Sequence, residues 1–401
     1  MLAQRTSLFK SSGTAAARAA AKAAADAGRE IVDLTAGEIW ADLAPTVRDG
    51  ALYAIHHGIN RYTDTVGLAD LREVLARKVS RETNQLWQPS EIAVTSGAKQ
   101  ALFNAAMVLV DPGDEVIIPA PYWTTFPAQV LVAGGIPVHV ETRDTGHVPT
   151  IAGIERALTP RTRAIVINTP ANPSGAVYDR DTLGAIAEIA LRRDLWVIFD
   201  ECYGAFAHPP HIHHPIVSVV PAVRPRTVVI NAFSKTLALT GWRIGYMAAR
   251  KEVIEAVKAL QSHTTSNPNV IAQHAVLNHL RYGDGAYETQ LRRQLAGARR
   301  QGLNILSGLT AVPQPEAQGG FYFYLDLSHL LQGGSATADE VVNRLLAEAG
   351  VATVSGTAFG DPMGLRLSYG VPPDMLARGL ARLVETLSRW DAHDARTARI
   401  A

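Results

Sequence analysis

Several features are scarce in this chain of 401 residues. Its single cysteine, Cys202, excludes a disulfide within the chain and is typical of a reducing compartment, so we expect a cytoplasmic protein. No run of about 18 uninterrupted apolar residues occurs, and a membrane-spanning helix is therefore not expected. Basic and acidic residues nearly balance, at 38 and 37, so neither a nucleic acid nor an anionic membrane is an expected partner.

The N-terminal stretch 12–28 is rich in alanine but lacks the uninterrupted apolar core of a secretory signal, because charged residues divide it. Its composition partly resembles an organellar transit peptide. Asp26 and a following strand instead favour a helix of the mature protein. We expect that helix to be capped near Ser12 or Thr14 and to end at Gly28.

Short β-type runs alternate with longer amphipathic stretches over the first 250 residues or so. Helical stretches such as 99–110 and 181–193 separate several of the strands. Strands are predicted at 92–95, 115–118, 137–140, 164–168, 196–200, 228–231 and 244–248. This alternation indicates an α/β fold with a mainly parallel seven-stranded sheet sandwiched by helices.

The pattern changes after about residue 285. The segments that follow are a charged helix at 287–305, a strand-like run near 320–326, an amphipathic segment at 338–349, strand-like runs at 351–354 and 365–368, and a last helix. We therefore predict three parts: an N-terminal segment 1–45 that packs on the small domain, a large domain 46–285, and a smaller α+β domain 286–401.

The segment 231–246, Asn-Ala-Phe-Ser-Lys-Thr-Leu-Ala-Leu-Thr-Gly-Trp-Arg-Ile-Gly-Tyr, carries the most specific chemical signal. Lys235 comes directly after a predicted strand, Ser234 precedes it, and Arg243 follows eight residues later. An amine that forms an imine needs a fixed position, and an anionic cofactor beside it needs hydroxyl and guanidinium donors. The segment therefore predicts an imine-forming lysine beside an anionic cofactor.

Other candidate residues lie where predicted strands end, which is the edge where ligands bind in parallel sheets. Gly97 opens a helix, so the backbone N–H groups of Gly97, Ala98 and Lys99 are candidates for a phosphate site. Asp200 ends an apolar strand and could keep a pyridine nitrogen protonated; an N-cap or an ion pair is the alternative. Tyr203 could donate to a ring oxygen, or it could simply pack in the core.

Two loops carry weaker signals. Asn172 lies in the turn 168–175, where its amide could bridge a ring oxygen and a substrate carboxylate. Histidines crowd the segment 208–214, which has four in seven residues. They could bind a metal, but the neighbouring prolines and the lack of nearby acidic or cysteine ligands favour a solvated loop, and no metal site is predicted.

In motif order and spacing, residues 34–369 resemble the bacterial-type aspartate aminotransferases, a subgroup that also contains prephenate aminotransferases. These proteins belong to the class I and II aminotransferases within the fold-type I pyridoxal-phosphate (PLP) enzymes. The matched motifs are Leu-Thr-Ala-Gly-Glu38, Arg-Tyr-Thr with Tyr62, Ser-Gly-Ala-Lys-Gln-Ala-Leu, Pro-Tyr-Trp123, Asn-Pro-Ser-Gly, Asp-Glu-Cys-Tyr203, Ser-Lys235, Thr-Gly-Trp-Arg243 and Arg366-Leu-Ser-Tyr. The resemblance implies the fold-type I architecture, pyridoxal 5'-phosphate as cofactor, and a homodimer with shared active sites.

The resemblance also assigns cofactor-binding roles to matching positions. Lys235 is expected to form the aldimine with PLP and to move the proton between substrate and cofactor. Asp200 is expected to pair with the pyridine nitrogen, Tyr203 and Asn172 with the ring oxygen, and Trp123 to stack on the ring. The residues expected at the phosphate are Gly97, Ala98, Ser234, Arg243 and, from a second subunit, Tyr62.

Substrate-binding roles follow from the same resemblance. Arg366 is expected to bind the substrate α-carboxylate through two parallel bonds, with Gly37, Trp123 and Asn172 beside it. Lys99 is expected to face the distal carboxylate of a dicarboxylic substrate, although a helix-surface residue is the alternative. The implied activity is transfer of an amino group from aspartate or glutamate to a 2-oxo acid by a ping-pong mechanism, a step of amino-acid metabolism and biosynthesis.

The chain departs from its relatives near the substrate pocket. Ile39 and Trp40 stand in the loop where the family usually has Pro-Asp-Phe, Asp64 and Ser355 stand where proline is common, and the histidine segment 208–214 is unusual. We expect Ile39 and Trp40 to reshape the pocket. The donor and the keto acid, prephenate included, therefore stay open. A PLP enzyme of the same fold doing elimination, replacement, cyclisation or decarboxylation is an alternative, and so is a non-catalytic PLP-binding regulatory domain.

Overall fold

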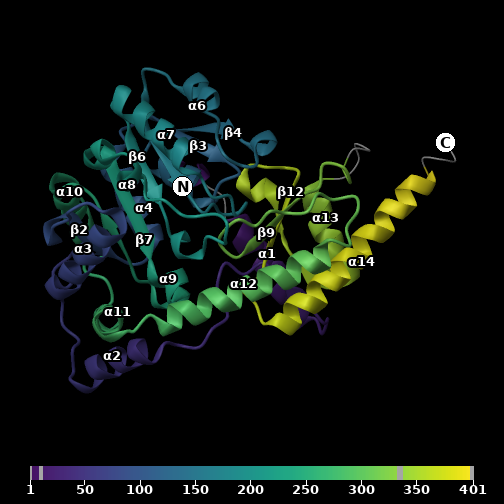
Figure 1. The fold of residues 1–401 in the computed structure, drawn as a ribbon, viewed down its shortest axis with the longest axis horizontal. Helices are drawn as coiled ribbons and strands as arrows, with labels where there is room; N and C mark the ends of the chain where they lie inside the picture. The colour runs from purple at the N-terminus through teal and green to yellow at the C-terminus, as the bar shows by residue number, and fades with distance from the viewer. Residues whose placement is uncertain (1, 9–11, 332–336, 398–401) are drawn as a thin grey trace.

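The computed structural model describes residues 2–8, 12–331 and 337–397, and its ribbon is drawn in Figure 1. The largest sheet has seven strands in the order β2-β8-β7-β6-β5-β3-β4. In chain order they are β2 (Ile92–Thr95), β3 (Glu115–Ala120), β4 (Ile136–Glu141), β5 (Thr162–Asn168), β6 (Trp196–Asp200), β7 (Thr227–Ala232) and β8 (Gly245–Ala248). Five neighbouring strands are parallel, and β8 runs antiparallel to both of its neighbours. The predicted mainly parallel seven-stranded sheet is confirmed.

Helices cover both faces of this sheet. Side chains alternate along each strand, so Ile198 of β6 packs into one core while Val197 and Phe199 pack into the other. The helices of the first core include α4 (Ala98–Leu109), α5 (Thr125–Val132) and α10 (Lys251–Ser262); those of the second include α2 (Pro45–His56), α3 (Ala69–Thr83), α6 (Ile151–Ala157), α7 (Arg180–Arg192), α8 (Ile216–Val219) and α11 (Val270–Tyr282).

A second, smaller part lies beside the large sheet (Figure 1). It contains an antiparallel sheet in the order β11-β12-β9, made of β9 (Tyr322–Asp326), β11 (Val354–Ser355) and β12 (Gly364–Ser368). A separate parallel pair joins β1 (Val32–Asp33) to β10 (Val351–Ala352). The single strand predicted at 351–354 is therefore wrong: the segment is divided between two sheets, because the two halves find different partners.

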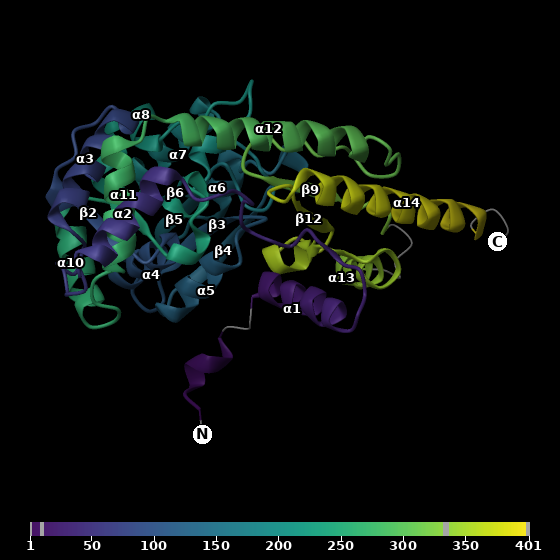
Figure 2. The same cartoon turned by 90° about the horizontal axis from the view of Figure 1, so that it is seen from below.

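Helices frame this smaller part. They are α1 (Gly13–Asp26), α12 (Ala286–Leu306), α13 (Ala338–Arg344) and α14 (Pro373–Thr397). Helix α12 runs along both parts, and α1 lies below α13 in the turned view (Figures 1 and 2). Helix α1 begins after Ser12 as predicted, but the Ser12 side chain makes no capping hydrogen bond. The helix ends two residues before Gly28, whose φ of +84° is left-handed. The amphipathic segment at 338–349 is α-helical to Arg344 and continues as a π-helical turn, Leu345–Ala349.

Local capping explains several helix starts. The Asp179 side chain accepts a hydrogen bond from Thr182 N at 2.8 Å and begins α7. Thr337 and Glu340 form a reciprocal capping box at α13. Each such cap stabilises a helix by about 1 kcal/mol, so the caps determine where helices begin, and the buried faces supply most of the stability.

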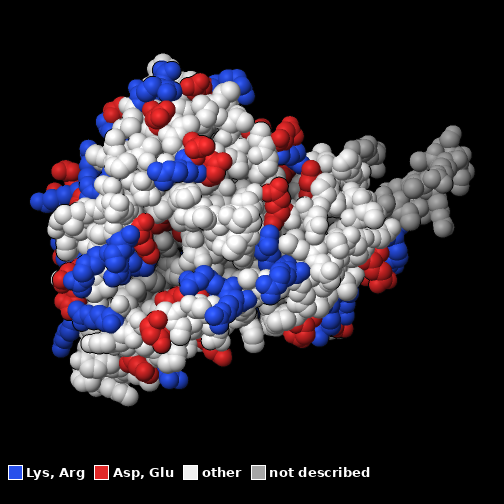
Figure 3. Space-filling model, in the orientation of Figure 1, with Lys and Arg blue, Asp and Glu red and all other residues white. Residues whose placement is uncertain are grey.

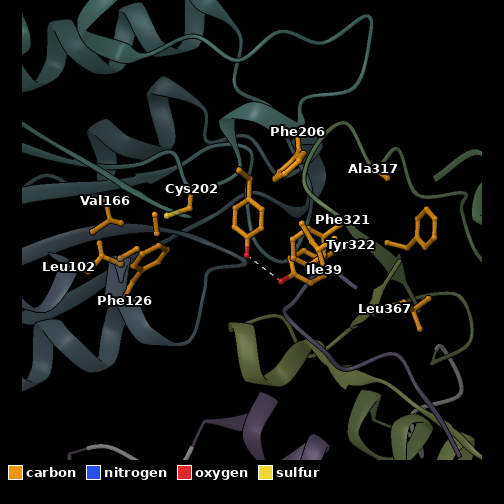
Figure 4. Close-up of a cluster of buried hydrophobic side chains, with 14 of the residues drawn as sticks. Ile39, Leu102, Phe126, Val166, Cys202, Phe206, Ala317, Phe321, Tyr322 and Leu367 are labelled. Carbon is orange, nitrogen blue, oxygen red and sulfur yellow. Dashed lines mark hydrogen bonds between the residues drawn. The ribbon is translucent and has the colours of Figure 1, made fainter. Parts of the chain in front are cut away.

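One core runs from the large sheet into the smaller part. Figure 4 shows Leu102, Val166 and Cys202 of the large sheet region in the same cluster as Tyr322 and Leu367 of the smaller part. On the face drawn in Figure 3, basic and acidic side chains are interspersed, in agreement with the formal net charge of +1. Within the described ranges, no helix is long and apolar enough to cross a membrane.

The histidine segment is a loop, but the prediction that it is solvated is wrong for two of its four histidines. His208 is buried and its Nε2 lies 2.9 Å from the Tyr369 hydroxyl. His213 has its Nε2 3.1 Å from a carboxylate oxygen of Glu201. The structure contains no group of three or more metal-binding side chains among the residues it describes. The loop turns inward because buried polar partners receive these imidazoles.

Candidate active site

A cavity of about 560 Å³ lies at the carboxyl-end edge of the large sheet, facing the smaller part. It collects side chains from elements that are far apart in the sequence. Its lining includes eleven of the thirteen predicted site residues: Gly37, Ala98, Lys99, Trp123, Asn172, Asp200, Tyr203, Ser234, Lys235, Arg243 and Arg366. Most of these residues follow strands of the large sheet, and they meet here because parallel strands present their carboxyl ends at one edge.

Lys235 lies on α9 (Phe233–Thr236), a single helical turn that follows β7 directly. Its Nζ donates a hydrogen bond to the carbonyl of Gly37, which comes from the N-terminal part of the chain. The same Nζ is 5.5 Å from the ring centre of Phe321 and 5.9 Å from that of Tyr203. The amine is thus held in the cavity by groups from three separate segments.

Asp200 ends β6 and is buried. Its Oδ1 accepts a hydrogen bond from the backbone N–H of Cys202 at 3.1 Å. The pKa of Asp200 is raised to about 6, chiefly by burial; the hydrogen bonds from Cys202 lower it, the charge of Glu201 raises it, and Lys235 lowers it. A buried carboxylate of this kind is stabilised by any cation that binds beside it.

Tyr203 faces the smaller part. Its hydroxyl is 3.2 Å from the Tyr322 hydroxyl, the interaction that the dashed line marks in Figure 4. Burial raises the pKa of Tyr203, and the Tyr322 hydroxyl raises it further, so Tyr203 stays protonated and able to donate.

Arg366 comes from the middle of β12 and is only 2% exposed. Its Nη1 donates to Asn172 Oδ1 at 3.0 Å and its Nη2 to the Thr35 carbonyl at 2.8 Å. Its Nε is buried and has no hydrogen-bond partner among the described residues. The guanidinium also stacks 4.4 Å from the Tyr322 ring centre, so its planar fork is fixed in orientation and can bind a carboxylate.

Another part of the site is formed where the turn between β2 and α4 meets Arg243. Gly97 has a φ of +79°, and a Cβ added to it would lie 2.7 Å from Arg243 Nη2. Arg243 is itself left-handed, and its Nη1 donates to the Thr240 carbonyl at 2.8 Å. This close approach needs glycine and leaves a cationic recess at the start of a helix.

One detail of the predicted anion site is wrong. The Gly97 N–H donates to the Thr95 carbonyl at 2.8 Å, so it is not free for a ligand. The N–H groups of Ala98 and Lys99, at the first two positions of α4, have no acceptor within the helix. Ser234 lines the same cavity and adds a hydroxyl.

The Lys99 side chain extends over Trp123, with its Nζ 5.0 Å from the ring centre. Burial lowers the pKa of Lys99, and the charge of Arg243 lowers it further. Lys99 is therefore more than a helix-surface residue, since its side chain lines the cavity.

Some predicted residues lie outside this cavity. Gly97 shapes the recess at Arg243 but does not line the cavity, and Tyr62 is 89% exposed and does not line the cavity either. Ile39 is buried and Trp40 is 60% exposed, and neither lines the cavity. The expectation that Ile39 and Trp40 reshape the pocket is therefore not met within this one chain.

The sequence reasoning missed other residues of the site. Asn168 ends β5, its Nδ2 donates to the Asp200 carbonyl at 3.1 Å, and its Oδ1 accepts from Asn172 N at 2.8 Å. The strand-end rule applied to β5 would have found it. Tyr322 and Arg18 also line the cavity, and Arg18 pairs with Glu38 at 3.2 Å. No local pattern marks these two residues, because the fold brings them in from distant segments.

Comparisons with known proteins cover nearly the whole chain. The family model described as aminotransferase class I and II matches residues 29–383. An aspartate aminotransferase of Geobacillus stearothermophilus is 38% identical, over 95% of this chain and 98% of the relative. An aspartate/prephenate aminotransferase of Thermus thermophilus is 39% identical, over 97% and 99%. The crystal structure of an aspartate aminotransferase from Rhizobium meliloti has a TM-score of 0.91 at 33% identity, covering 97% of this chain and 99% of that one. The chain therefore belongs to the class I and II aminotransferases.

Proposed function

We propose that this protein is a PLP-dependent aminotransferase that moves an amino group from aspartate or glutamate to a 2-oxo acid. The observation that carries the proposal is the position of Lys235, Asp200 and Arg366 around one cavity. An amine, a buried carboxylate and a fixed guanidinium are the groups that an aldehyde cofactor with a pyridine nitrogen and an α-amino acid require.

The residues fit pyridoxal phosphate at both of its ends. The recess between Gly97 and Arg243 and the free N–H groups of α4 suit a phosphate. The buried Asp200, with its raised pKa, suits a protonated ring nitrogen in front of it. Tyr203 and Asn172 suit the ring oxygen, Trp123 the ring face, and Ser234 the phosphate. When bound, the cofactor supplies an electron sink for the pair left when the substrate's α-proton is removed.

The protein groups bind the substrate and transfer its proton. Arg366, with its unpaired Nε and its fixed fork, binds the α-carboxylate and so orients the α-carbon. Lys235 Nζ takes the α-proton and returns it, while Asp200 preserves the positive charge at the ring nitrogen. Gly37 holds the amine of Lys235 through its carbonyl. Lys99 supplies the cation for a distal carboxylate, which favours dicarboxylic substrates.

A direct assay tests the proposal. Purified protein incubated with PLP, aspartate and 2-oxoglutarate is expected to give oxaloacetate and glutamate in equal amounts. Release of ammonia instead would indicate elimination, an alternative that the aminotransferase names of the matched relatives do not favour. Absence of both products across a panel of amino donors would contradict enzymatic activity and support a regulatory PLP-binding role.

The assembly and the location are also proposals. Tyr62 projects from the chain with 89% of its surface exposed, which supports a role at a second subunit's cofactor in a homodimer. The one free, buried cysteine, Cys202, supports a reducing cytoplasm. We propose the three-part organisation as well, with 1–45 packed on the small domain, because β1 pairs with β10.

A further inference from the structure

A second cavity, of about 600 Å³, lies behind the helical turn that carries Lys235. Ser234 and Lys235 line the active-site cavity, whereas Phe233 and Thr236 of the same turn line the second one. The second cavity also contains Glu201, the residue that directly follows Asp200. Two consecutive acidic residues thus end up on opposite sides of the sheet edge.

Glu201 is only 5% exposed, so its carboxylate needs partners. One oxygen lies 3.1 Å from His213 Nε2, and the other lies 3.4 Å from Asn231 Nδ2. Its backbone N–H donates to the Ile230 carbonyl of β7 at 3.0 Å. The closest donor to this carboxylate is therefore an imidazole from the unusual histidine segment.

The position of His213 is tightly defined. Its ring stacks on Phe199, with 6.1 Å between ring centres. It also packs against Gly204, where an added Cβ would lie 2.7 Å from His213 Cδ2. Its Nδ1 is buried without a hydrogen-bond partner among the described residues, so Glu201 is the group that orients the ring.

We propose that His213 is a positioning residue that holds the Glu201 side chain in place behind Asp200, and that the charge of Glu201 adds to the negative potential that retains a cation at the cofactor's ring nitrogen. This inference rests on the proposed function and names further residues for it. The charge of Glu201 is already among the causes that raise the pKa of Asp200, after burial. A cation in front of Asp200 experiences both negative charges, because the two residues are adjacent in the chain.

Other charged groups face the same cavity. They come from the helices α3, α11 and α12 and from the histidine segment itself: Lys78, Glu82, His279, Glu288, Arg292 and His211. Glu82 pairs with Lys78 at 2.6 Å and Glu288 with His279 at 3.0 Å. These carboxylates thus have their own partners, and among the groups that line this cavity His213 is the titratable side chain within hydrogen-bond distance of Glu201.

The test uses the full-length protein without cofactor, so its result does not depend on catalysis. The titration midpoint of the Asp200 carboxyl group is measured by infrared difference spectroscopy, and the matching Asp200→Asn protein identifies the signal of Asp200. Glu201→Gln keeps the shape and removes the charge, so the Asp200 midpoint is expected to fall by on the order of one pH unit. His213→Phe keeps the ring stack and removes the donor, so the Glu201 carboxylate is expected to turn away from Asp200 and the Asp200 midpoint to fall similarly.

Two further variants separate positioning from mere packing. His213→Gln supplies an amide donor and is expected to restore the Asp200 midpoint. His211→Phe, two residues earlier on the same loop, is the matched control and is expected to leave the midpoint unchanged. In the holoprotein, Glu201→Gln and His213→Phe are each expected to weaken PLP affinity about 3- to 10-fold. The double variant is expected to have the same PLP affinity as Glu201→Gln alone.

The inference is overturned by an unchanged Asp200 midpoint in a folded Glu201→Gln protein. It is also overturned if His213→Phe weakens PLP binding while the Asp200 midpoint stays in place, because the ring would then act only through packing. Either result leaves the aminotransferase assignment intact. Conversely, absence of transaminase activity with the expected midpoint shifts would refute the proposed function and not the electrostatic link.

Discussion

At the scale of single residues, three side chains carry the proposed chemistry, and each is held differently. Lys235 is held by the Gly37 carbonyl, Asp200 by a backbone N–H, and Arg366 by Asn172 and a carbonyl of the N-terminal segment. The lysine was predictable from its local motif. The bonds that hold Arg366 were not, because its partner Asn172 is 194 residues away in the chain.

Lys235→Ala removes the amine that holds the cofactor and moves the α-proton. We expect the rate of transamination to fall by at least about 10⁴-fold, because the same amine acts both in holding the cofactor and in moving the α-proton. The product assay with aspartate and 2-oxoglutarate measures this fall. Borohydride treatment of the wild-type holoprotein is expected to attach the cofactor to the peptide around Lys235. Label on any other peptide, or retained activity in the variant, would disprove the assignment.

Asp200→Asn is expected to raise the stability of the apoprotein at neutral pH and to lower the transaminase activity. The pKa of Asp200 is raised from 3.8 to about 6, so the native apoprotein binds a proton that the unfolded chain releases between these pH values. Stability of the wild-type apoprotein therefore falls as pH rises from about 4 to about 6. We expect the variant to be stabilised at pH 7 by on the order of 2 kcal/mol, and this gain to vanish at pH 4.

Thermal unfolding of both apoproteins at pH 4 and pH 7 checks this stability difference. Transaminase activity of the same variant is expected to fall by at least about 10²-fold, since the ring nitrogen loses its carboxylate. A stability gain of equal size at both pH values would show that burial of the charge is not its cause.

Arg366→Lys preserves the charge and loses the planar fork. We expect kcat/KM for aspartate to fall about 10- to 100-fold, because one ammonium replaces two parallel bonds to the α-carboxylate. Steady-state kinetics measure the effect, and PLP affinity serves as the internal control. A variant with unchanged kcat/KM would place the α-carboxylate elsewhere.

At the scale of elements, the site depends on turns at strand ends. The β2–α4 turn and the Arg243 loop come within van der Waals contact at Gly97, and α9 places Lys235 within one helical turn of β7. The strand positions followed from the sequence, with most ends within two residues. The division of 351–354 between two sheets did not, because strands this short are defined by their partners and not by their own propensity.

Gly97→Ala tests the turn. Gly97 has a φ of +79°, a backbone conformation that is strained for a residue with a Cβ, and the added Cβ would also displace Arg243 Nη2. We expect PLP affinity to fall at least about tenfold. Gly113→Ala is a matched control, because Gly113 has a φ of +90° with nothing within 4 Å of the added atom. Both variants are expected to lose about 1 kcal/mol of stability. Only Gly97→Ala is expected to lose PLP affinity, as measured by fluorescence titration. Equal PLP affinities of the two variants would refute the role of the recess between Gly97 and Arg243.

At the scale of the whole molecule, one hydrophobic core joins the large sheet to the smaller part, and the cavity lies between them. One chain leaves Tyr62 exposed and outside this cavity. The proposed role of Tyr62 therefore requires a second copy of the chain.

A homodimer with shared sites gives a direct prediction. Size-exclusion chromatography with light scattering is expected to give twice the chain mass of 43.0 kDa. Tyr62→Phe is expected to keep that mass and to weaken PLP affinity about 3- to 10-fold, through loss of one hydrogen bond to the phosphate. Tyr53→Phe, which also changes an exposed tyrosine, is the control. A monomer, or a Tyr62→Phe protein with unaltered affinity, would contradict the shared site.

The sequence by itself determined the α/β order, the strand positions and the motif around Lys235, because hydrophobic periodicity and turn chemistry act over a few residues. Only the tertiary structure decided which polar groups lack water and which partners they meet. It placed Lys235 Nζ on the Gly37 carbonyl, turned His213 toward Glu201, and aligned Arg366 with Asn172. Burial and pairing depend on segments that are distant in the chain, and for that reason the charges of the site could be listed from the sequence but their proton affinities could not.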